Sequence, residues 1–172
     1  MHNDIQFPQK KRIVITILCG GLLVFLYILI FFFSDQDAEA SGSISHYFSE
    51  KLVEFANFVN GGHWSDVLVQ QFSHYWEHPI RKLAHFSEYM AMGILVFCIL
   101  HQWVRSNRKS ILPIVWVAVS AGFDEFHQSF IPGRVTSVAD VLLDTCGGAF
   151  GVLLCVLVLR YFIYRIPSLA QD

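Results

Sequence analysis

The sequence predicts an all-α membrane protein, a four-transmembrane-helix bundle formed by a single domain over residues 1–172. Three observations predict this fold: a high apolar content, four long apolar stretches, and an uneven distribution of basic residues. Hydrophobic residues make up 54% of the 172 residues and charged residues only 15%, whereas soluble domains average about 25% charged residues. The formal net charge of −2 at pH 7 argues against a nucleic-acid partner, because nucleic-acid binding uses a basic surface.

The four apolar stretches have lengths typical of membrane-spanning helices, which need about 20 mostly apolar residues. We expect spans at about residues 13–33, 83–103, 111–128 and 138–164. The first span contains no charged residue. The other three carry acidic residues, but only near one end of each, so we interpret them as spans too.

The first span has an alternative interpretation as a signal peptide. Basic residues 10–12 precede it, and Ala38-Glu39-Ala40 follows it as an A-x-A cleavage signal. The apolar region of a signal peptide runs for about 7–15 residues, whereas this uncharged stretch has 21. We therefore expect the first helix to be retained as an anchor.

The basic residues predict the orientation, because positive charge concentrates on the cytoplasmic side of membrane proteins. With both termini in the cytoplasm, eight of the 12 basic residues lie inside. These eight are Lys10, Lys11, Arg12, Arg105, Arg108, Lys109, Arg160 and Arg165. All acidic residues except Asp4 and Asp172 then lie outside. The sequence thus predicts an N-in/C-in topology.

The external loop between the first two spans, residues 34–79, is expected to contain two amphipathic helices. Apolar residues recur there at helical spacing in two runs, Ile44, Phe48, Leu52, Phe55 and Val59, then Trp64, Val67, Leu68, Phe72, Tyr75 and Trp76. The second run is expected to end at His78-Pro79. Aromatic-rich amphipathic helices usually lie in the membrane interface. They would either cap the bundle or act as a lid for a lipid substrate, and both interpretations stay open.

Polar residues gather at the external ends of the last three spans, where ionisable groups are costly and are candidates for function. They are Lys82, His85 and Glu88 in the second span, Asp124, Glu125, His127 and Gln128 in the third, and Asp140 and Asp144 in the fourth. Between the last two spans, a Pro-Gly turn would hold Arg134 over the same level. Chance placement would scatter these residues over all depths of the membrane. Their common depth therefore predicts a site in the outer leaflet.

Helical spacing groups these side chains further. His85 and Glu88 share one face of their helix, as do Asp124 and His127 of the next. Asp140 and Asp144 lie on one stripe with a Gly-x-x-x-Gly motif that allows a neighbouring helix to approach closely. We therefore expect both carboxylates of the fourth span to face the bundle interior.

Three chemical interpretations compete for the site. In the first, a divalent metal is bound by His85, Glu88, Asp124 and His127, because Glu-x-x-His motifs on facing helices build metal sites in bundles. In the second, the candidate catalytic groups move protons without metal. These groups are His85, Glu88, Asp124, Glu125, His127 and Asp140. In the third, buried charges only pair with one another.

In the second interpretation, the remaining polar residues bind the substrate or an anion. They are Lys82, Gln128, Arg134 and Asp144. Lys82 and Arg134, with Arg81 as a third candidate, supply fewer cations than the five carboxylates require. Those carboxylates belong to Glu88, Asp124, Glu125, Asp140 and Asp144. A protonated histidine, a metal or a cationic ligand would balance the charge.

Three segments resemble the motifs of the VanZ-like family. They are the RKLAHFSEY of residues 81–89, the DEFHQSFIPGR of residues 124–134 and the DVLLDTCG of residues 140–147. The resemblance implies a multi-pass protein of the bacterial cytoplasmic membrane. It also implies a link to resistance against teicoplanin and related lipoglycopeptides, with which the family's namesake is associated. The family more often has Asn where this chain has Asp144.

Two functional hypotheses follow. In the first, the protein binds or modifies a cell-envelope lipid or a lipid-linked precursor at the outer leaflet, because the polar cluster lies at that depth. In the second, it is a non-catalytic membrane or interaction protein whose polar cluster only stabilises the helix bundle. The sequence names neither a reaction nor a cofactor.

Overall fold

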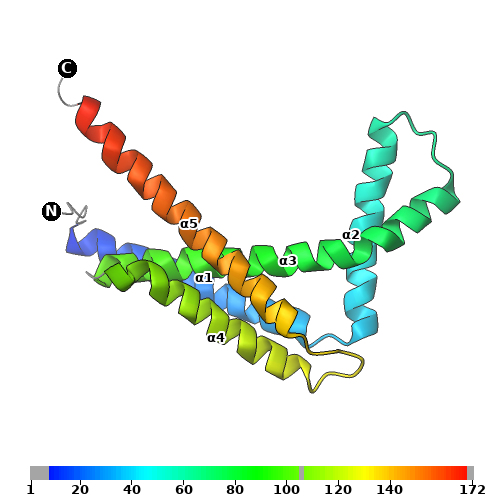
Figure 1. The fold of residues 1–172 in the computed structure, drawn as a ribbon, viewed down its shortest axis with the longest axis horizontal. Coiled ribbons are helices and arrows are strands. Elements are labelled where there is room, and N and C mark those ends of the chain that lie inside the picture. The colour runs from blue at the N-terminus through cyan, green and yellow to red at the C-terminus, as the bar shows by residue number, and fades with distance from the viewer. Residues whose placement is uncertain (1–7, 105–106, 170–172) are drawn as a thin grey trace.

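The structure, a computed structural model, describes residues 8–104 and 107–169 (Figure 1). Within these ranges it is helical and contains no strand, which confirms the all-α prediction. The elements are α1 Gln9–Ser34, α2 Ala38–Val59, α3 Asp66–Trp103, the short 3₁₀ helix η1 Asn107–Ser110, α4 Ile111–Gln128 and α5 Val138–Leu169. Residues 4, 105 and 172, which enter the orientation argument, lie outside the described residues.

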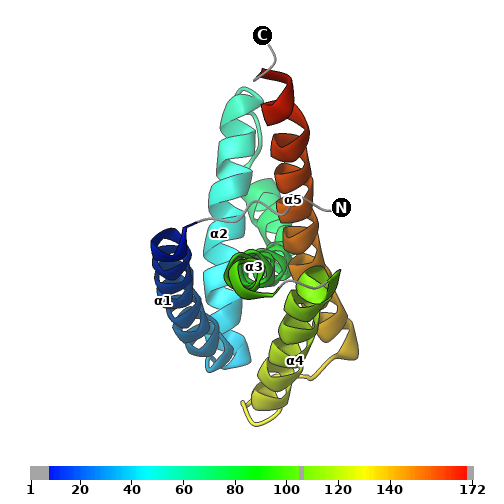
Figure 2. The same ribbon diagram turned by 90° about the vertical axis from the view of Figure 1, so that its left-hand side faces the viewer.

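Helix α3 is the central element of the bundle. It contacts each of the other α-helices, and Figure 2 shows α1, α4 and α5 arranged around its axis. Helix α2 crosses α3 near one end of the molecule, whereas the start of α1 and the end of α5 lie at the opposite end (Figure 1). The core formed around α3 includes the fully buried Tyr89, Met92 and Val117.

Three helices of the described residues are long and apolar enough to cross a membrane: α1, α3 and the part of α5 up to Tyr161. Their outward side chains are apolar, and Ile17 of α1, for example, is 66% exposed. Helix α4 has only 18 residues and ends in a polar turn from Asp124 to Gln128. It is not among the three, so the four-span topology and its orientation stay predictions.

Helix α3 is longer than the sequence predicts. The expected break at His78-Pro79 is wrong, because one helix of 38 residues runs through Pro79. Proline removes one backbone hydrogen bond and usually kinks a helix, and the ribbon of α3 bends close to its crossing with α2 (Figure 1). The helix starts at Asp66, and the side chain of Ser65 just before it accepts a hydrogen bond from the backbone N–H of Leu68.

Helix α2 forms where the apolar spacing predicts a helix, but it buries its small polar face. Ser45, Ser49 and Val53 are its buried residues. The Ser49 hydroxyl donates to the backbone carbonyl of Ser73 at 2.7 Å, which ties α2 to α3. The apolar face points away from the protein, and Phe55 is 64% exposed. Such a face suits contact with lipid.

Helices α3 and α5 approach each other closely through glycines, as the Gly-x-x-x-Gly motif predicts. A Cβ atom added at Gly147 would collide with the carbonyl oxygen of Phe86, and one at Gly151 with that of Met90. One turn before Gly147, Asp144 is consequently buried. The glycine contact therefore turns the polar start of α5 toward α3.

Candidate functional site

A polar cavity of about 240 Å³ lies where the middle of α3 meets the end of α4 and the start of α5. Seven of the ten residues that the sequence indicates as site residues line it. These seven are Lys82, His85, Glu125, Gln128, Arg134, Asp140 and Asp144. His78 and Arg81 of α3 complete its ionisable lining, and the start of α2 covers one side at Ala38.

Two contacts fix the start of α5 beside the middle of α3 and the end of α4. Lys82 of α3 forms an ion pair with Asp140 in the first turn of α5. Glu125 of α4 accepts a hydrogen bond from the backbone N–H of Ser137, which precedes α5. The connection between α4 and α5 turns through Gly133, whose φ of 75° favours glycine. These contacts hold the cavity's carboxylates in place.

Arg134 lies over the cavity, but its described hydrogen bonds go to backbone carbonyls. Its Nε donates to the carbonyl of Gln36 at 3.1 Å and its Nη2 to that of Phe33 at 3.3 Å. The guanidinium thus binds carbonyl groups at and just after the end of α1. Partial burial, and then the nearby charge of Arg81, lower the pKa of Arg134 from its ordinary value, yet arginine stays charged in proteins.

Three helices contribute one side chain each to a compact cluster within the site, of which Asp144 is buried and the other two are partly buried. One ligand atom each from His85, Asp124 and Asp144 lie within 4.8 Å of one another. Among the described residues, His85 Nδ1 and Asp144 Oδ1 are buried without a hydrogen-bond partner. Two carboxylates this close repel each other where water is excluded. A shared proton or a bound cation would relieve the repulsion. The cluster therefore suits proton transfer or a bound cation.

The cluster differs from the ligand set that the sequence predicts for a metal. Of that set, only His85 and Asp124 lie in the compact group, and Asp144 takes the third place. One imidazole and two carboxylates suit divalent ions such as Mn²⁺, Fe²⁺ or Zn²⁺. If the site binds a metal, these three residues would hold it, and the metal would supply a Lewis acid beside the cavity.

His127 and Glu88, the other two predicted ligands, point elsewhere. The ring of His127 lies 5.0 Å from that of Phe31, and its Nε2 atom is 3.5 Å from an oxygen of Asp35. His127 therefore connects α4 to the end of α1. Glu88 lines a neighbouring cavity on the other side of His85.

That neighbouring cavity has a volume of about 140 Å³ and is mostly apolar. Its walls come from α1, α2 and α3 and include Phe33, Ile44 and Phe48. It shares three residues with the polar cavity, namely Arg81, His85 and Arg134. The two cavities, one polar and one apolar, therefore adjoin at these shared side chains.

Sequence reasoning misses some residues of the site. Arg81, indicated only as a third cation, lines both cavities, and its i,i+4 spacing from His85 was a usable signal. His78, which the sequence indicates only as the end of a loop helix, lines the polar cavity. Ser34 is buried at the end of α1, where its hydroxyl accepts a hydrogen bond from the Gln128 amide at 3.2 Å. No local pattern marks Ser34, because its role depends on the packing of α1 against α4.

Comparison with known proteins identifies one family. The family model described as VanZ/LLP1 matches residues 20–160, which include part of α1, all of α3, most of α5 and the whole candidate site. Comparisons with curated proteins and with solved structures gave no match.

Proposed function

This chain belongs to the VanZ-like family of membrane proteins, and we propose that it binds the anionic headgroup of a cell-envelope lipid or lipid-linked precursor. The observation that carries the proposal is the pair of adjoining cavities. Three cations line the polar cavity, namely Arg81, Lys82 and Arg134. The apolar cavity is lined in part by α2. A lipid has the same two parts, a charged headgroup and an apolar chain.

The size of the polar cavity supports a headgroup as its occupant. Pockets that enclose a drug-sized molecule measure about 300–1,000 Å³, and this cavity measures about 240 Å³. Arginine recognises phosphate and carboxylate groups through its planar fork of N–H donors. Two of the cations already contact a carboxylate. The N···O distance from Arg81 to Glu77 is 3.6 Å, and Lys82 forms an ion pair with Asp140. An anionic headgroup would share these cations with the protein's own carboxylates.

The His85–Asp124–Asp144 cluster supports chemistry at the bound headgroup. A histidine beside two carboxylates can accept and return a proton near neutral pH. In the alternative, the three side chains would hold a divalent ion that polarises the headgroup. In both cases Asp124 is the central residue, because it lies in the cluster and is oriented by the Gln128 amide at 3.1 Å.

We further propose four spans with both termini in the cytoplasm of a bacterial cell, so that the site lies in the outer leaflet. The start of α1 and the end of α5 share one end of the bundle, which supports this topology (Figure 1). Single cysteines at Gly62 and Thr136, in a chain whose own cysteines are replaced, should react with a membrane-impermeant maleimide in intact cells. A cysteine at Arg108 should react only after permeabilisation. The reverse pattern would contradict the proposed orientation.

Lipid binding by the purified full chain tests the headgroup proposal. The wild type and Arg81→Gln, with Lys51→Gln as a matched control on the exposed face of α2, would be titrated with short-chain phosphatidylglycerol and phosphatidylcholine. We expect the wild type and the control to prefer the anionic lipid, and Arg81→Gln to lose most of that preference. Equal binding of both lipids by the wild type would rule out headgroup recognition by charge.

Susceptibility to teicoplanin tests the link to the family phenotype. Cells would produce the wild type or Asp124→Asn at matched membrane levels. Resistance in the wild type that disappears in the variant would connect the cluster to the phenotype. No resistance in wild-type cells would leave the lipid proposal to be decided by the binding titration alone.

The polar contacts also support a second candidate function, a non-catalytic protein whose polar network stabilises the bundle. Lys82–Asp140, Glu125–Ser137 and Gln128–Ser34 all join different elements. Under this candidate, Asp124→Asn lowers the stability of the protein in detergent, and substitutions at Trp64 or Trp76 impair function more than site substitutions do. Unchanged stability after Asp124→Asn would count against it.

A further inference from the structure

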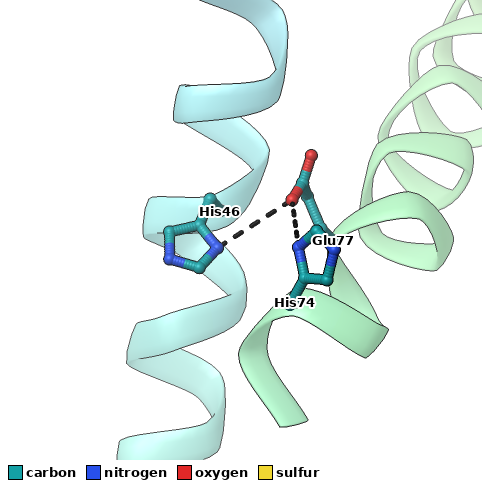
Figure 3. A group of neighbouring side chains, drawn as sticks. All are labelled: His46, His74 and Glu77. Carbon is teal, nitrogen blue, oxygen red and sulfur yellow. Dashed lines mark ion pairs between the residues drawn. The ribbon is translucent and has the colours of Figure 1, made fainter. Parts of the chain in front are cut away.

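Two histidines and a glutamate form a second cluster outside the cavities, between α2 and α3. Figure 3 shows His46 of α2 and, on α3, His74 and Glu77, with both imidazoles facing the carboxylate. One ligand atom from each residue lies within 4.8 Å of the others. The two histidines are 28 positions apart in the sequence, and no local motif joins them.

The spacing of these atoms fits an ion better than direct hydrogen bonds. Glu77 Oε2 lies 3.4 Å from His74 Nδ1 and 3.9 Å from His46 Nδ1. Hydrogen bonds from N–H to oxygen measure about 2.7–3.2 Å, so both separations are too long. Around a tetrahedral metal with bonds of about 2.0–2.2 Å, neighbouring ligand atoms stand roughly 3.3–3.6 Å apart. The His74–Glu77 separation lies within that range and the His46–Glu77 separation is slightly longer, so a small movement of the His46 side chain would close the site.

We propose that His46, His74 and Glu77 bind a divalent transition-metal ion of the Zn²⁺ type. Two imidazoles and one carboxylate are common ligands of Zn²⁺, and three protein ligands leave a fourth position for water or another ligand. The ion can reach the site, because the side chain of His74 is 85% exposed and that of His46 is 42% exposed. This inference does not depend on the proposed function.

The metal would clamp α2 onto α3. Among the described side chains, Ser49 makes a hydrogen bond between the two helices, to the backbone of Ser73. A metal held by His46 and His74 adds a strong bond between them. Helix α2 forms one wall of the apolar cavity, so the ion fixes that wall.

Glu77 also connects the metal site to the polar cavity. Its Oε2 atom faces the two histidines, while its Oε1 atom lies 3.6 Å from the guanidinium of Arg81. Carboxylates that bind a metal are commonly held by a second partner that orients them. Arg81, which lines both cavities, has this position. The ion and the cavity thus share one carboxylate–guanidinium pair.

Zinc titration of the full chain tests the proposal. The protein would be purified in detergent without a polyhistidine tag, stripped with EDTA, and titrated with Zn²⁺ by calorimetry. The variants are His46→Ala and His74→Ala, and the matched control is His63→Ala, an exposed histidine in the connection between α2 and α3. Loss of a true ligand should weaken binding by more than the roughly 10–100-fold that loss of an orienting partner costs. His63→Ala should bind as the wild type does.

Two outcomes would overturn the metal site: no saturable Zn²⁺ binding by the wild type, or equal binding by the wild type and both ligand variants. Equal binding would assign the ion to another place, such as the His85 cluster. Cobalt provides a second readout, since the intense visible absorption of tetrahedral Co²⁺ should appear in the wild type and the control but not in His74→Ala. This signal does not depend on activity.

Hydrogen–deuterium exchange tests the clamp separately. Zn²⁺ should slow exchange of the α2 backbone in the wild type and in His63→Ala, and should leave His46→Ala unchanged. If Zn²⁺ binds the wild type and exchange in α2 does not slow, the clamp between the helices is wrong.

Discussion

Lys82 of α3 and Asp140 of α5 form an ion pair that joins two helices across 58 positions of the chain. The pair lies at the polar cavity, and both side chains are about one-third exposed, at 29% and 32%. On α5, Asp140 lies two turns before the first glycine that contacts α3 closely. The charged pair and the glycine contacts therefore fix the angle at which α5 presents Asp144 to the site.

The first prediction concerns this pair. Lys82→Met leaves Asp140 without its cation in a partly buried site, and should lower the free energy of unfolding by about 1.5–3 kcal/mol, the usual worth of a hydrogen bond to a charged group. The double variant Lys82→Met/Asp140→Leu should lose less, because no unpaired charge remains. Unfolding in mixed detergent micelles measures both. Lys51→Met, which removes an exposed pair with Glu54, should change little.

The second prediction concerns the close contact of α5 with α3. Gly151→Ala places a methyl group against the carbonyl of Met90, and should cost about 1–3 kcal/mol because a tightly packed contact has no room for it. Gly20→Ala is the matched control, since nothing lies within 4 Å of the added Cβ. The control should leave stability unchanged or raise it by about 0.5–1 kcal/mol. Equal effects of the two substitutions on thermal unfolding would contradict the contact.

The third prediction concerns Asp144, which is only 5% exposed and has one oxygen without a described partner. In the presence of a chelator, Asp144→Asn should stabilise the protein by about 1–3 kcal/mol, the cost of an unsatisfied buried group. An amide removes the repulsion with Asp124 and can donate to its carboxylate. Thermal unfolding in detergent measures the change, with Glu50→Gln as the control. A loss of stability would contradict repulsion between the two carboxylates.

The fourth prediction concerns the exposed apolar face of α2. A spin label at Phe55 should be accessible to oxygen dissolved in lipid and protected from a water-soluble nickel relaxing agent. A label at the neighbouring Glu54 should show the opposite preference, because the side chain of Glu54 is exposed and charged. The chain for both labels carries alanine at its own cysteines and is placed in lipid bilayers. Equal accessibility of the two labels would show that α2 does not lie against lipid.

Much of the site was accessible from the sequence. A polar segment next to an apolar one is a local property of each helix, and packing the apolar segments side by side brings the polar segments together. For this reason Lys82, Glu125 and Asp140 could be expected together before any contact was known. Their pairing could not, because which cation meets which carboxylate depends on how far each helix rotates about its axis.

Arg134 and His127 show this limit most clearly. Their placement near the site follows from the Pro-Gly turn and from the helix end, but their partners lie in and just after α1, at Phe33, Gln36 and Asp35. The ends of α1 and α4 are about 100 residues apart in sequence, and no motif encodes that meeting. The same reason hides the cluster of His46, His74 and Glu77.

By itself, the sequence determined that this chain is helical, embedded in a membrane and a member of the VanZ-like family, because hydropathy, periodicity and motifs are properties of neighbouring residues. The tertiary structure decided the rest. It carried α3 through Pro79, turned the serine face of α2 inward, and selected His85, Asp124 and Asp144 from many polar candidates. These outcomes depend on close packing between distant segments, where a glycine, a serine or one ion pair sets the rotation of a whole helix.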